Sequence, residues 1–403
     1  MSGKVVIVGA GVVGASTAYF LAQRGFDVEV IEGREPAWGA SGRNPGFVWL
    51  HMRAEGTQME LALAGRRLYD QLIQELDDFE FRPSGGMIYF FEHQADLFPA
   101  FVQNRVAAGL PMELLDAAAA REVCEVLPPS IAGATYNPLD AHVHPTRLVE
   151  ALSAAAQRAG ARFTHATPVA ELDVSDGRCR GVVTADGRSE ADIVVLAGGV
   201  WTGRLLEPHG LRIPLVPMRL QVMETEPADV RFRPILYGPT AIKQYDFTKQ
   251  LPGYSADDFT HPLEATVPGV ELLELVAQRR DGRVLLGCPM DFPDFDDRTT
   301  VAGIGLTLAV LSDHLPFIRS LPLARSWAGL LPETPDALPI LGPVEGLDGL
   351  VLATGHVFGM SGGAISGKLL AQHLAGEPTD LDLSPFRFER ESLGELAAAH
   401  RRW

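Results

Sequence analysis

The chain has 403 residues, of which 46% are hydrophobic and 21% charged, and its formal net charge is −17. This composition is that of an ordinary globular protein and excludes a disordered chain. The acidic excess makes nucleic acid an unfavourable partner, because its phosphate backbone carries charge of the same sign.

The sequence shows no targeting signal and no cysteine pattern that indicates a function. Lys4 already belongs to the first predicted strand, which leaves no room for a secretory signal, and no apolar run is long enough to span a bilayer. Cys124, Cys179 and Cys288 are widely spaced, which favours buried core thiols over disulfides or a zinc site. We therefore expect a cytoplasmic protein of two domains with no bound metal.

Residues 4–32 read as a strand, a glycine-rich turn, a helix and a second strand that ends at an acid. Gly9 allows a sharp turn, Gly11 lets the backbone approach a pyrophosphate, and Gly14 lets the helix pack close to the sheet. Free amides at the helix N-terminus favour an anion, and Glu32 can accept hydrogen bonds from a ribose. The pattern predicts a dinucleotide-binding unit; an ordinary glycine turn in a parallel sheet is the alternative.

The next segment is the loop Gly39-Ala-Ser-Gly-Arg-Asn-Pro-Gly46. Its glycines and proline indicate a tight turn whose small residues permit contact with a flat ring. Ser41, Arg43 and Asn44 can donate hydrogen bonds to phosphate or ring oxygens. A surface loop with ordinary turn residues is the alternative, and the position beside the first glycine motif favours a cofactor contact.

The rest of the chain alternates between strands and helices. A helix is predicted over 57–76, a strand over 87–91 and a helix from Pro145 to Gly160. Strands are then predicted at 162–164, 170–174, 179–184 and 190–196. Ala197, Gly198 and Gly199 follow the last of them and suggest a second close approach to the cofactor.

Residues 216–325 have a different pattern, with broken strands such as 220–224 and 283–286 and one helix near 302–314. This pattern predicts a mostly antiparallel layer inserted into the nucleotide-binding part. The C-terminal part returns to the first pattern, with a strand at 350–353 and a helix over 361–374.

Two C-terminal segments complete the set of motifs: Trp327-Ala-Gly-Leu-Leu-Pro-Glu-Thr-Pro-Asp-Ala-Leu-Pro-Ile-Leu-Gly342 and Ala353-Thr-Gly-His-Val-Phe-Gly-Met-Ser-Gly-Gly363. Together with the two N-terminal motifs, they closely resemble the D-amino acid oxidase and glycine oxidase family, which includes sarcosine oxidases and opine or proline dehydrogenase subunits. The resemblance covers nearly the whole chain.

The resemblance implies an α/β fold with a Rossmann-like FAD-binding domain of the glutathione reductase type. An inserted α+β substrate domain on a mostly antiparallel sheet would cover the flavin. We expect the FAD-binding domain at 1–84, 142–215 and 326–403, and the substrate domain at 85–141 and 216–325.

The same resemblance implies which residues contact FAD. Non-covalent binding is expected, because the position near Leu330 lacks a cysteine and the loop at Arg43 lacks a histidine. The expected contacts are Gly9, Gly11, Val12, Val13, Gly14, Glu32, Gly33, Arg34, Ala40, Ser41, Arg43, Asn44, Pro45, Gly46, Phe47, Val169, Ala197, Gly198, Gly199, Trp201, Gly329, Leu331, Gly355, His356, Val357, Phe358, Gly359, Met360 and Ser361.

One departure from the family concerns the substrate. Glycine-oxidase-like members carry an arginine that binds the substrate carboxylate where this chain has Leu331, so another cation would have to bind an acid group. Lys243 is the first candidate, with Arg53 and His51 behind it; a surface-exposed Lys243 and a core or surface His51 are the alternatives. The residues expected at the reacting centre are Trp49, His51, Lys243, Tyr245, His356 and Phe358.

The activity implied is oxidation of the CH–NH bond of an amine, such as an amino acid or N-substituted amino acid, by hydride transfer to flavin N5. The imine would then hydrolyse. Alternatives are a catalytic or electron-transfer subunit of a heteromeric opine or proline dehydrogenase, a nicotinamide-dependent reductase, and a non-catalytic FAD-binding scaffold. A homo-oligomer and a partner subunit both remain open.

Overall fold

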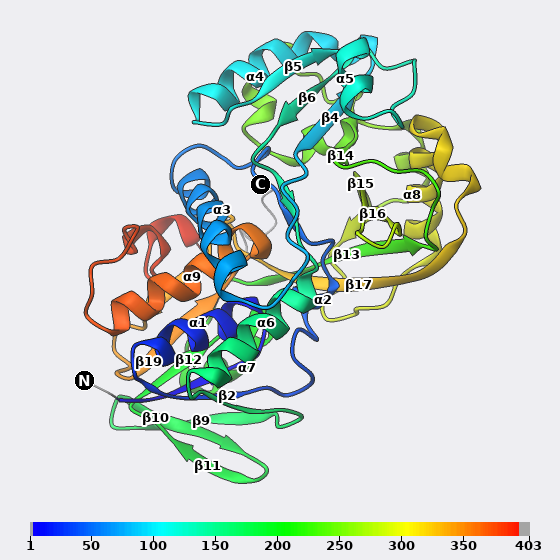
Figure 1. The fold of residues 1–403 in the computed structure, drawn as a ribbon. Helices are drawn as coiled ribbons and strands as arrows, with labels where there is room; N and C mark the ends of the chain where they lie inside the picture. The colour runs from blue at the N-terminus through cyan, green and yellow to red at the C-terminus, as the bar shows by residue number, and fades with distance from the viewer. Residues whose placement is uncertain (1–2, 395–403) are drawn as a thin grey trace.

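The computed structural model describes residues 3–394 and shows two regions, each built on one large sheet (Figure 1). The ends of the predicted FAD-binding domain, residues 1–2 and 395–403, lie outside the described residues. In the first region, neighbouring strands are parallel except for the last pair, β18 and β19. Its sheet has the order β18 (Ile340–Pro343), β19 (Leu350–Thr354), β12 (Ile193–Leu196), β1 (Lys4–Val8), β2 (Asp27–Ile31) and β8 (Arg162–Thr164).

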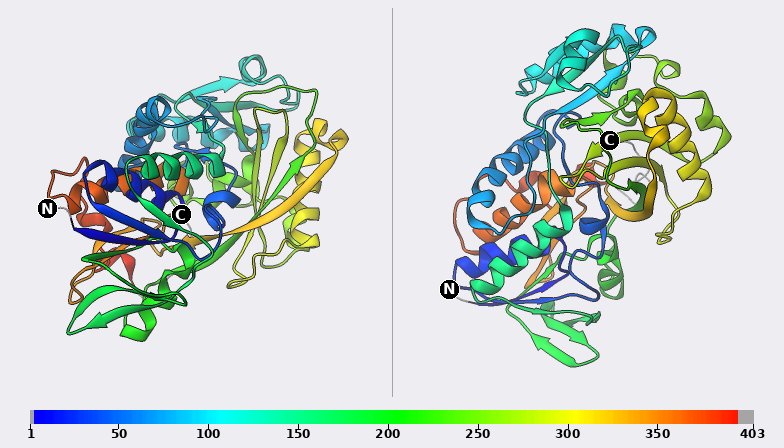
Figure 2. Two further views of the ribbon diagram at one scale, coloured as in Figure 1. Left: turned by 60° about the horizontal axis from the view of Figure 1, so that its bottom comes forward. Right: turned by 45° about the vertical axis from the view of Figure 1, so that its right-hand side comes forward.

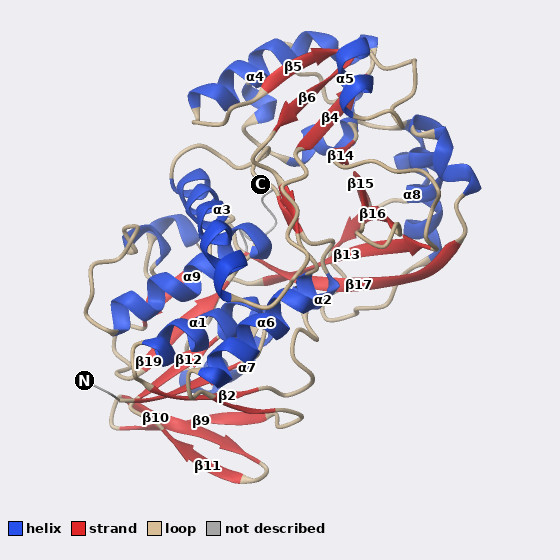
Figure 3. Ribbon diagram, viewed as in Figure 1, coloured by secondary structure: helices blue, strands red, loops and turns tan. Residues whose placement is uncertain are grey.

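The two faces of this sheet follow from the alternation of side chains along β1. Val5 and Ile7 pack into the cluster formed with the helices, whereas Val6 and Val8 pack into a cluster with the small sheet below. Figure 3 shows the helices on one face and the strands of the small sheet on the other. These elements are α1 (Val12–Gln23), α3 (Thr57–Glu75), α6 (Pro145–Arg158) and α9 (Gly359–Leu374), and strands β9 (Val169–Ser175), β10 (Arg178–Thr184) and β11 (Gly187–Glu190).

The N- and C-terminal segments meet where α1 crosses α9. A Cβ atom on Gly363 would lie 2.7 Å from Val12 Cγ1, and one on Gly367 would lie 2.5 Å from the backbone nitrogen of Thr17. The hydroxyl of Ser16 donates a hydrogen bond of 2.6 Å to the carbonyl of Ala364. The glycines of α9 therefore allow two segments about 350 residues apart to form one packed unit.

The second region is an eight-stranded sheet in which only the β14–β4 pair is parallel. Helix α8 (Val301–His314) covers one face, where Leu286 and Val276 pack against Leu311. The opposite face turns toward the first region. The strand order is β17 (Leu323–Glu333), β13 (Val216–Thr225), β16 (Val284–Asp291), β15 (Glu271–Gln278), β14 (Ile235–Tyr237), β4 (Gly86–Phe90), β6 (Gly133–Asn137) and β5 (Glu113–Asp116).

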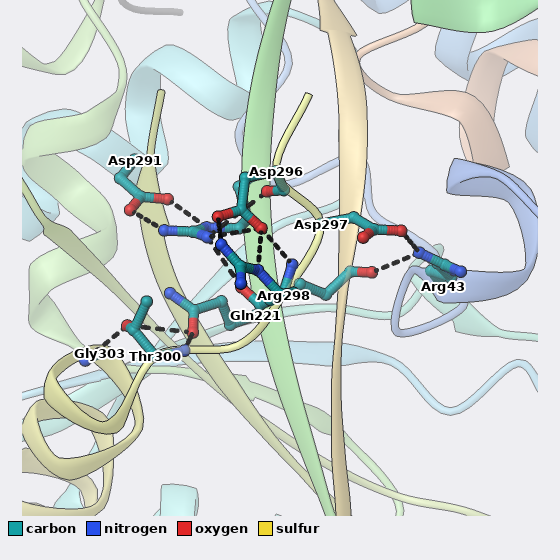
Figure 4. A network of polar contacts seen from close by, with 10 residues as sticks. Arg43, Gln221, Asp291, Asp296, Asp297, Arg298, Thr300 and Gly303 are labelled. Atoms are coloured by element: carbon teal, nitrogen blue, oxygen red, sulfur yellow. Dashed lines mark hydrogen bonds and ion pairs between the residues drawn. The ribbon is translucent and has the colours of Figure 1, made fainter. Parts of the chain in front are cut away.

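Buried polar side chains fix α8 and the preceding loop on this sheet (Figure 4). Gln221 on β13 accepts a hydrogen bond of 2.7 Å from the amide of Thr300, and the Thr300 hydroxyl accepts one of 3.1 Å from the amide of Gly303. Thr300 thus caps the N-terminus of α8. Arg219, also on β13, forms a two-pronged ion pair with Asp291 on β16. The loop between β16 and α8 is therefore held by β13.

Most predicted elements are present at nearly the predicted bounds, with three differences. The strand predicted over 190–196 is two strands, β11 and β12, separated by residues 191–192. The sequence predicted neither β15 nor β17, and it also left out β5, β6, β14, β18 and the helices at 98–107 and 117–123. Residues 326–333, which were placed in the FAD-binding part, run in β17 of the eight-stranded sheet, and the chain crosses to the first region between 334 and 339 (Figures 1 and 2).

Shorter elements complete the described chain. No helix among residues 3–394 is both long and apolar enough to cross a membrane. The remaining elements are α2 (Ala40–Arg43), α4 (Phe98–Ala107), α5 (Ala117–Val123), α7 (Thr202–Leu206) and the two-stranded pair β3 (Phe47–Val48) with β7 (Ala141–His142).

Candidate active site

A cavity of about 630 Å³ joins the two regions. In the first region it is lined by the carboxyl ends of parallel strands, at Val8 on β1, Leu196 on β12 and Thr354 on β19. In the second region it reaches the face of the large sheet that α8 leaves uncovered, at Leu273 and Leu275 on β15. Its size is that of a site for a small molecule or cofactor, and the carboxyl edge of a parallel sheet is where such ligands bind.

The glycine motif after β1 forms one end of the cavity. Gly9 has a φ of 108°, and a Cβ atom there would lie 2.6 Å from the carbonyl oxygen of Ala197. At Gly11 a Cβ atom would lie 2.9 Å from Ser41 Oγ. Gly14 does not line the cavity: a Cβ atom there would lie 2.0 Å from the Gly9 carbonyl oxygen, so this glycine lets α1 pack against β1, as the sequence predicts. The motif is thus built for close backbone approach.

Glu32 at the end of β2 is held in place by backbone amides. Its Oε2 accepts a hydrogen bond of 2.7 Å from Ala10, and its Oε1 accepts one of 2.8 Å from Arg34. The carboxylate lines the cavity beside the glycine turn. This is the position in which an acid accepts hydrogen bonds from a ribose.

The loop of residues 39–46 folds onto the N-terminus of α1. Ser41 Oγ accepts a hydrogen bond of 2.9 Å from the amide of Val12. Asn44 holds the turn together, because its Nδ2 donates to the carbonyl of Ala40 at 2.9 Å and its Oδ1 accepts from the amide of Gly46 at 2.7 Å. Ser41 and Asn44 both line the cavity.

Besides Gly14, three residues of the predicted cofactor set lie behind the cavity wall instead of lining it. The guanidinium of Arg43 turns away to pair with Asp297 (Figure 4) and lies 4.4 Å above the Trp38 ring. Gly46 is bonded through its carbonyl to the amide of Val143 at 2.8 Å. Gly329 on β17 packs against Arg43, where a Cβ atom would lie 2.9 Å from Arg43 Cβ. Arg43 therefore anchors its loop and is not placed to donate hydrogen bonds to a phosphate in the cavity.

The other end of the first region is formed by the turn between β19 and α9. Residues 355–361 all line the cavity, and α9 begins at Gly359, so the helix N-terminus points its first amides toward this space. His356 Nε2 lies 2.9 Å from the hydroxyl of Ser366. Burial lowers the pKa of His356 to about 3, so the imidazole is neutral and cannot act as a cation.

An aromatic chamber lies under the eight-stranded sheet. The rings of Trp49 and Tyr237 stack with centroids 4.1 Å apart, and Phe358 and Tyr245 also line the cavity there. Leu331 on β17, where the resemblance implies an arginine, contributes an apolar wall. The chamber is therefore mostly apolar and excludes water from whatever binds in it.

The one buried arginine among the described residues that line the cavity is Arg53. Its Nε donates a hydrogen bond of 3.0 Å to the carbonyl of Trp49, and its guanidinium carbon lies 3.2 Å from the centroid of the Phe358 ring. Burial lowers the pKa of Arg53, but an arginine remains protonated at neutral pH.

His51 does not reach the cavity, although the sequence made it a candidate catalytic residue. It is fully buried, its Nδ1 lies 2.8 Å from the Asp140 carboxylate, and its Nε2 lies 2.7 Å from the hydroxyl of Thr135. Both ring nitrogens are thus occupied. His51 is therefore a core histidine, which was one of the alternatives to a catalytic role.

Lys243 is also absent from the cavity wall. Lys243 lies in a 3₁₀ segment (Pro239–Gln244), and its Nζ is 2.5 Å and 2.6 Å from the two carboxylate oxygens of Glu264. The prediction that Lys243 binds a substrate carboxylate is therefore wrong, because a neighbouring acid already neutralises its charge. Surface exposure, the other alternative, is wrong as well, since only 9% of the residue is exposed.

The remaining predicted residues meet around the cavity. Those that line it are Gly9, Gly11, Val12, Val13, Glu32, Gly33, Arg34, Ala40, Ser41, Asn44, Pro45, Phe47, Trp49, Val169, Ala197, Gly198, Gly199, Trp201, Tyr245, Leu331, Gly355, His356, Val357, Phe358, Gly359, Met360 and Ser361.

Sequence reasoning missed several wall residues. Val8 and Ile31 could have been found, since they end the two predicted strands of the nucleotide unit. Leu220, Leu273 and Cys288 could not, because nothing in a strand sequence says which face will meet another region. The other missed wall residues are Trp38, Gly39, Pro168, Ala170, Leu196, Thr202, Arg204, Leu205, Tyr237, Leu275, Pro332, Ala353 and Thr354.

Comparison with known proteins shows which family this chain belongs to. Residues 4–373 match the family model described as DAO, FAD dependent oxidoreductase. The chain belongs to the FAD dependent oxidoreductase family. It is 30% identical to a glycine oxidase of Pseudomonas aeruginosa over 96% of this chain and 98% of that protein. It is 26% identical to a D-amino acid dehydrogenase of Bradyrhizobium diazoefficiens, covering 96% and 98% of the two chains.

The fold of this oxidoreductase is also similar to that of a solved structure. The crystal structure of glycine oxidase from Geobacillus kaustophilus superposes with a TM-score of 0.82 at 26% identity, covering 96% of this chain and 99% of that one. The expected α/β fold with a Rossmann-like nucleotide unit is confirmed.

The residues present fit FAD. At the Gly11 end, a side chain would meet Ser41 Oγ and fill the space through which a diphosphate reaches backbone amides. At the other end, the start of α9 offers amides to an electron-rich ring. Cys288 lines the cavity, but burial raises the pKa of its thiol, which keeps it protonated and a weak nucleophile. Non-covalent binding of FAD stays a prediction.

Proposed function

We propose that this FAD dependent oxidoreductase oxidises the CH–NH bond of an amine that bears a carboxylate, an amino acid or an N-substituted amino acid. The observation that carries the proposal is that one continuous cavity joins a nucleotide cradle at Gly11 and Glu32 to an aromatic chamber at Trp49 and Tyr237. Relatives named glycine oxidase and D-amino acid dehydrogenase support the same class of substrate.

Each part of the cavity has a role in this proposal. Gly9, Gly11 and Glu32, which line one end of the cavity, would hold the ADP half of FAD, and residues 355–361, which line the other, would contact its ring. When bound, FAD accepts a hydride from the carbon next to the substrate nitrogen. Among the described residues, the chamber wall has no buried carboxylate and no cationic histidine, so its residues chiefly orient the substrate and exclude water. The released imine hydrolyses in water.

Glycine is a poor substrate in this proposal. At the position of the arginine that the family resemblance implies, Leu331 offers an apolar wall and no donor. An acid group must therefore bind elsewhere, and the methylene of glycine has little apolar surface with which to fill the chamber. Substrates with a side chain or N-substituent gain burial that glycine does not.

Anaerobic reduction of the holoenzyme tests the proposal. Glycine, N-methylglycine, both enantiomers of alanine and proline, and N-carboxyalkyl amino acids are each added while the visible flavin absorbance is recorded. At least one N-substituted or side-chain-bearing acid should bleach the flavin, with a carbonyl product, and glycine should do so much more slowly. Failure of every amine to bleach a flavin that dithionite reduces would contradict it.

The electron acceptor is read from the same preparation. Rapid reoxidation by air identifies an oxidase, whereas slow reoxidation by air and rapid reoxidation by a quinone identify a dehydrogenase, with or without a partner subunit. A cytoplasmic location is part of the proposal.

A further inference from the structure

Three cationic side chains line the cavity within residues 3–394, namely Arg34, Arg53 and Arg204. Arg34 and Arg204 are exposed and stack on Trp38 and Phe295, at the nucleotide end. Arg53 is only 3% exposed and belongs to the aromatic chamber. It is therefore the described cation best placed to meet a substrate acid.

The hydrogen bonding of Arg53 is incomplete. Nε donates to the carbonyl of Trp49, and Tyr245 also bonds the guanidinium, but Nη1 is buried and has no hydrogen-bond partner among the described residues. The indole Nε1 of Trp49 is buried without a partner in the same part of the chain. A buried donor without an acceptor is unfavourable, and more so when it is charged.

Both unpartnered groups are donors, which restricts the ligand that would satisfy them. A carboxylate has acceptors only, and an arginine binds it in a charge-assisted pair. An amide or a neutral amine would supply fewer acceptors and no opposite charge. The walls that the large sheet contributes nearby, at Leu220, Leu273 and Leu331, are apolar and suit a hydrocarbon substituent.

We propose that Arg53, assisted by the indole N–H of Trp49, binds the substrate carboxylate. It would take the role of the arginine that the family resemblance implies at position 331, where this chain has Leu331. This rests on the proposed function and specifies its substrate as an acid held from the segment of residues 49–53, not from β17. The apolar wall left by Leu331 then accepts a side chain or N-substituent of the amine.

Ligand binding to the holoenzyme tests the inference without turnover. Acetate and benzoate, with acetamide and benzamide as neutral isosteres, are titrated while the flavin spectrum is followed. In the unmodified protein at least one acid should bind at least 10-fold more tightly than its amide. Arg53→Met should weaken that acid about 10- to 100-fold and leave the amide unchanged. Trp49→Phe should give a smaller loss of the same sign.

A matched control removes a positive charge outside the cavity. Lys249→Met, at a lysine that pairs with Asp246, should leave the affinities for acid and amide within about twofold of the unmodified protein. Arg53→Lys keeps the charge but loses the planar fork, and should bind the acid with intermediate affinity. If Arg53→Met does not fold, Arg53→Lys alone tests the role of Arg53.

The outcomes separate the inference from the proposed function. Equal affinity of the unmodified holoenzyme for acids and amides, or acid affinity that Arg53→Met and Arg53→Lys leave unchanged, would overturn the role of Arg53. Amine oxidation could stand in either case, because bleaching of the flavin by amines is measured independently. Bleaching by neutral amines in preference to their acid counterparts would also overturn the inference.

Discussion

The two regions of the molecule use their residues in opposite ways. Around the six-stranded sheet, the cofactor site is made of backbone, and Gly9 and Gly11 are required because a side chain would fill the space. Under the eight-stranded sheet, the site is made of side chains, and two of its predicted residues, Lys243 and His51, are instead paired with the buried acids Glu264 and Asp140. A nucleotide cradle thus depends on the steric requirements of short segments, whereas a substrate chamber depends on which long-range pairs the folded chain contains.

A pair of glycine substitutions compares the two regions directly. Gly14→Ala would place a Cβ atom 2.0 Å from the carbonyl oxygen of Gly9, so α1 must shift away from β1 and the FAD site should be lost. Gly305→Ala, in α8 where no atom lies within 4 Å of the added Cβ, should stabilise the protein by about 0.5–1 kcal/mol. Flavin content after purification and thermal unfolding measure both. Normal flavin content in Gly14→Ala would contradict the close packing.

The Lys243–Glu264 pair distinguishes a structural charge from a binding one. Lys243→Met leaves the carboxylate of Glu264 buried without its cation, and should lower the free energy of unfolding by about 3–5 kcal/mol. The KM of the best substrate should not change. The double variant Lys243→Met with Glu264→Gln should recover most of the stability. A large rise in KM with unchanged stability would return Lys243 to the substrate site.

Glu333 at the end of β17 predicts a pH dependence of stability. The residue is buried, Oε2 has no hydrogen-bond partner among residues 3–394, and burial raises the pKa of its carboxyl from 4.5 to about 8. Because the folded pKa is the higher one, the stabilisation is complete below about pH 4.5 and is lost as the pH rises to about 8.

Glu333→Gln should therefore remove part of this decline and be more stable than the unmodified protein at pH 8, by at least about 1 kcal/mol. The difference should vanish near pH 4.5. Denaturant unfolding at several pH values measures it, with Glu122→Gln on the exposed face of α5 as the control. Equal pH slopes for Glu333→Gln and the unmodified protein would show that the carboxyl is not perturbed.

The nucleotide half of the fold was predictable because its signals are local. Residues 4–32 contain a buried strand, three spaced glycines and a terminal acid, and each has the predicted place in β1, α1 and β2. Helix α9 (Gly359–Leu374) was predicted over 361–374 for the same reason. Even here Arg43 was misassigned, since its partner Asp297 comes from the loop before α8, far away in the sequence.

The substrate half was less predictable because its contacts are long-range. A lone lysine in a segment with few cations suggests a binding role, and nothing local shows that Glu264 will neutralise Lys243. His51 is likewise taken up by Asp140, a residue 89 positions away. Arg53 was named only as a second candidate, because its burial and its unpartnered Nη1 exist only in the folded chain.

A crystal structure of the holoenzyme with bound acetate would locate both ligands at once. The ADP half of FAD should lie between Gly11 and Glu32, its ring should lie over residues 355–361, and an acetate oxygen should be within hydrogen-bond distance of Arg53. A flavin bound outside this cavity, or acetate held at Lys243 while the Arg53 guanidinium stays without an anion, would contradict this arrangement.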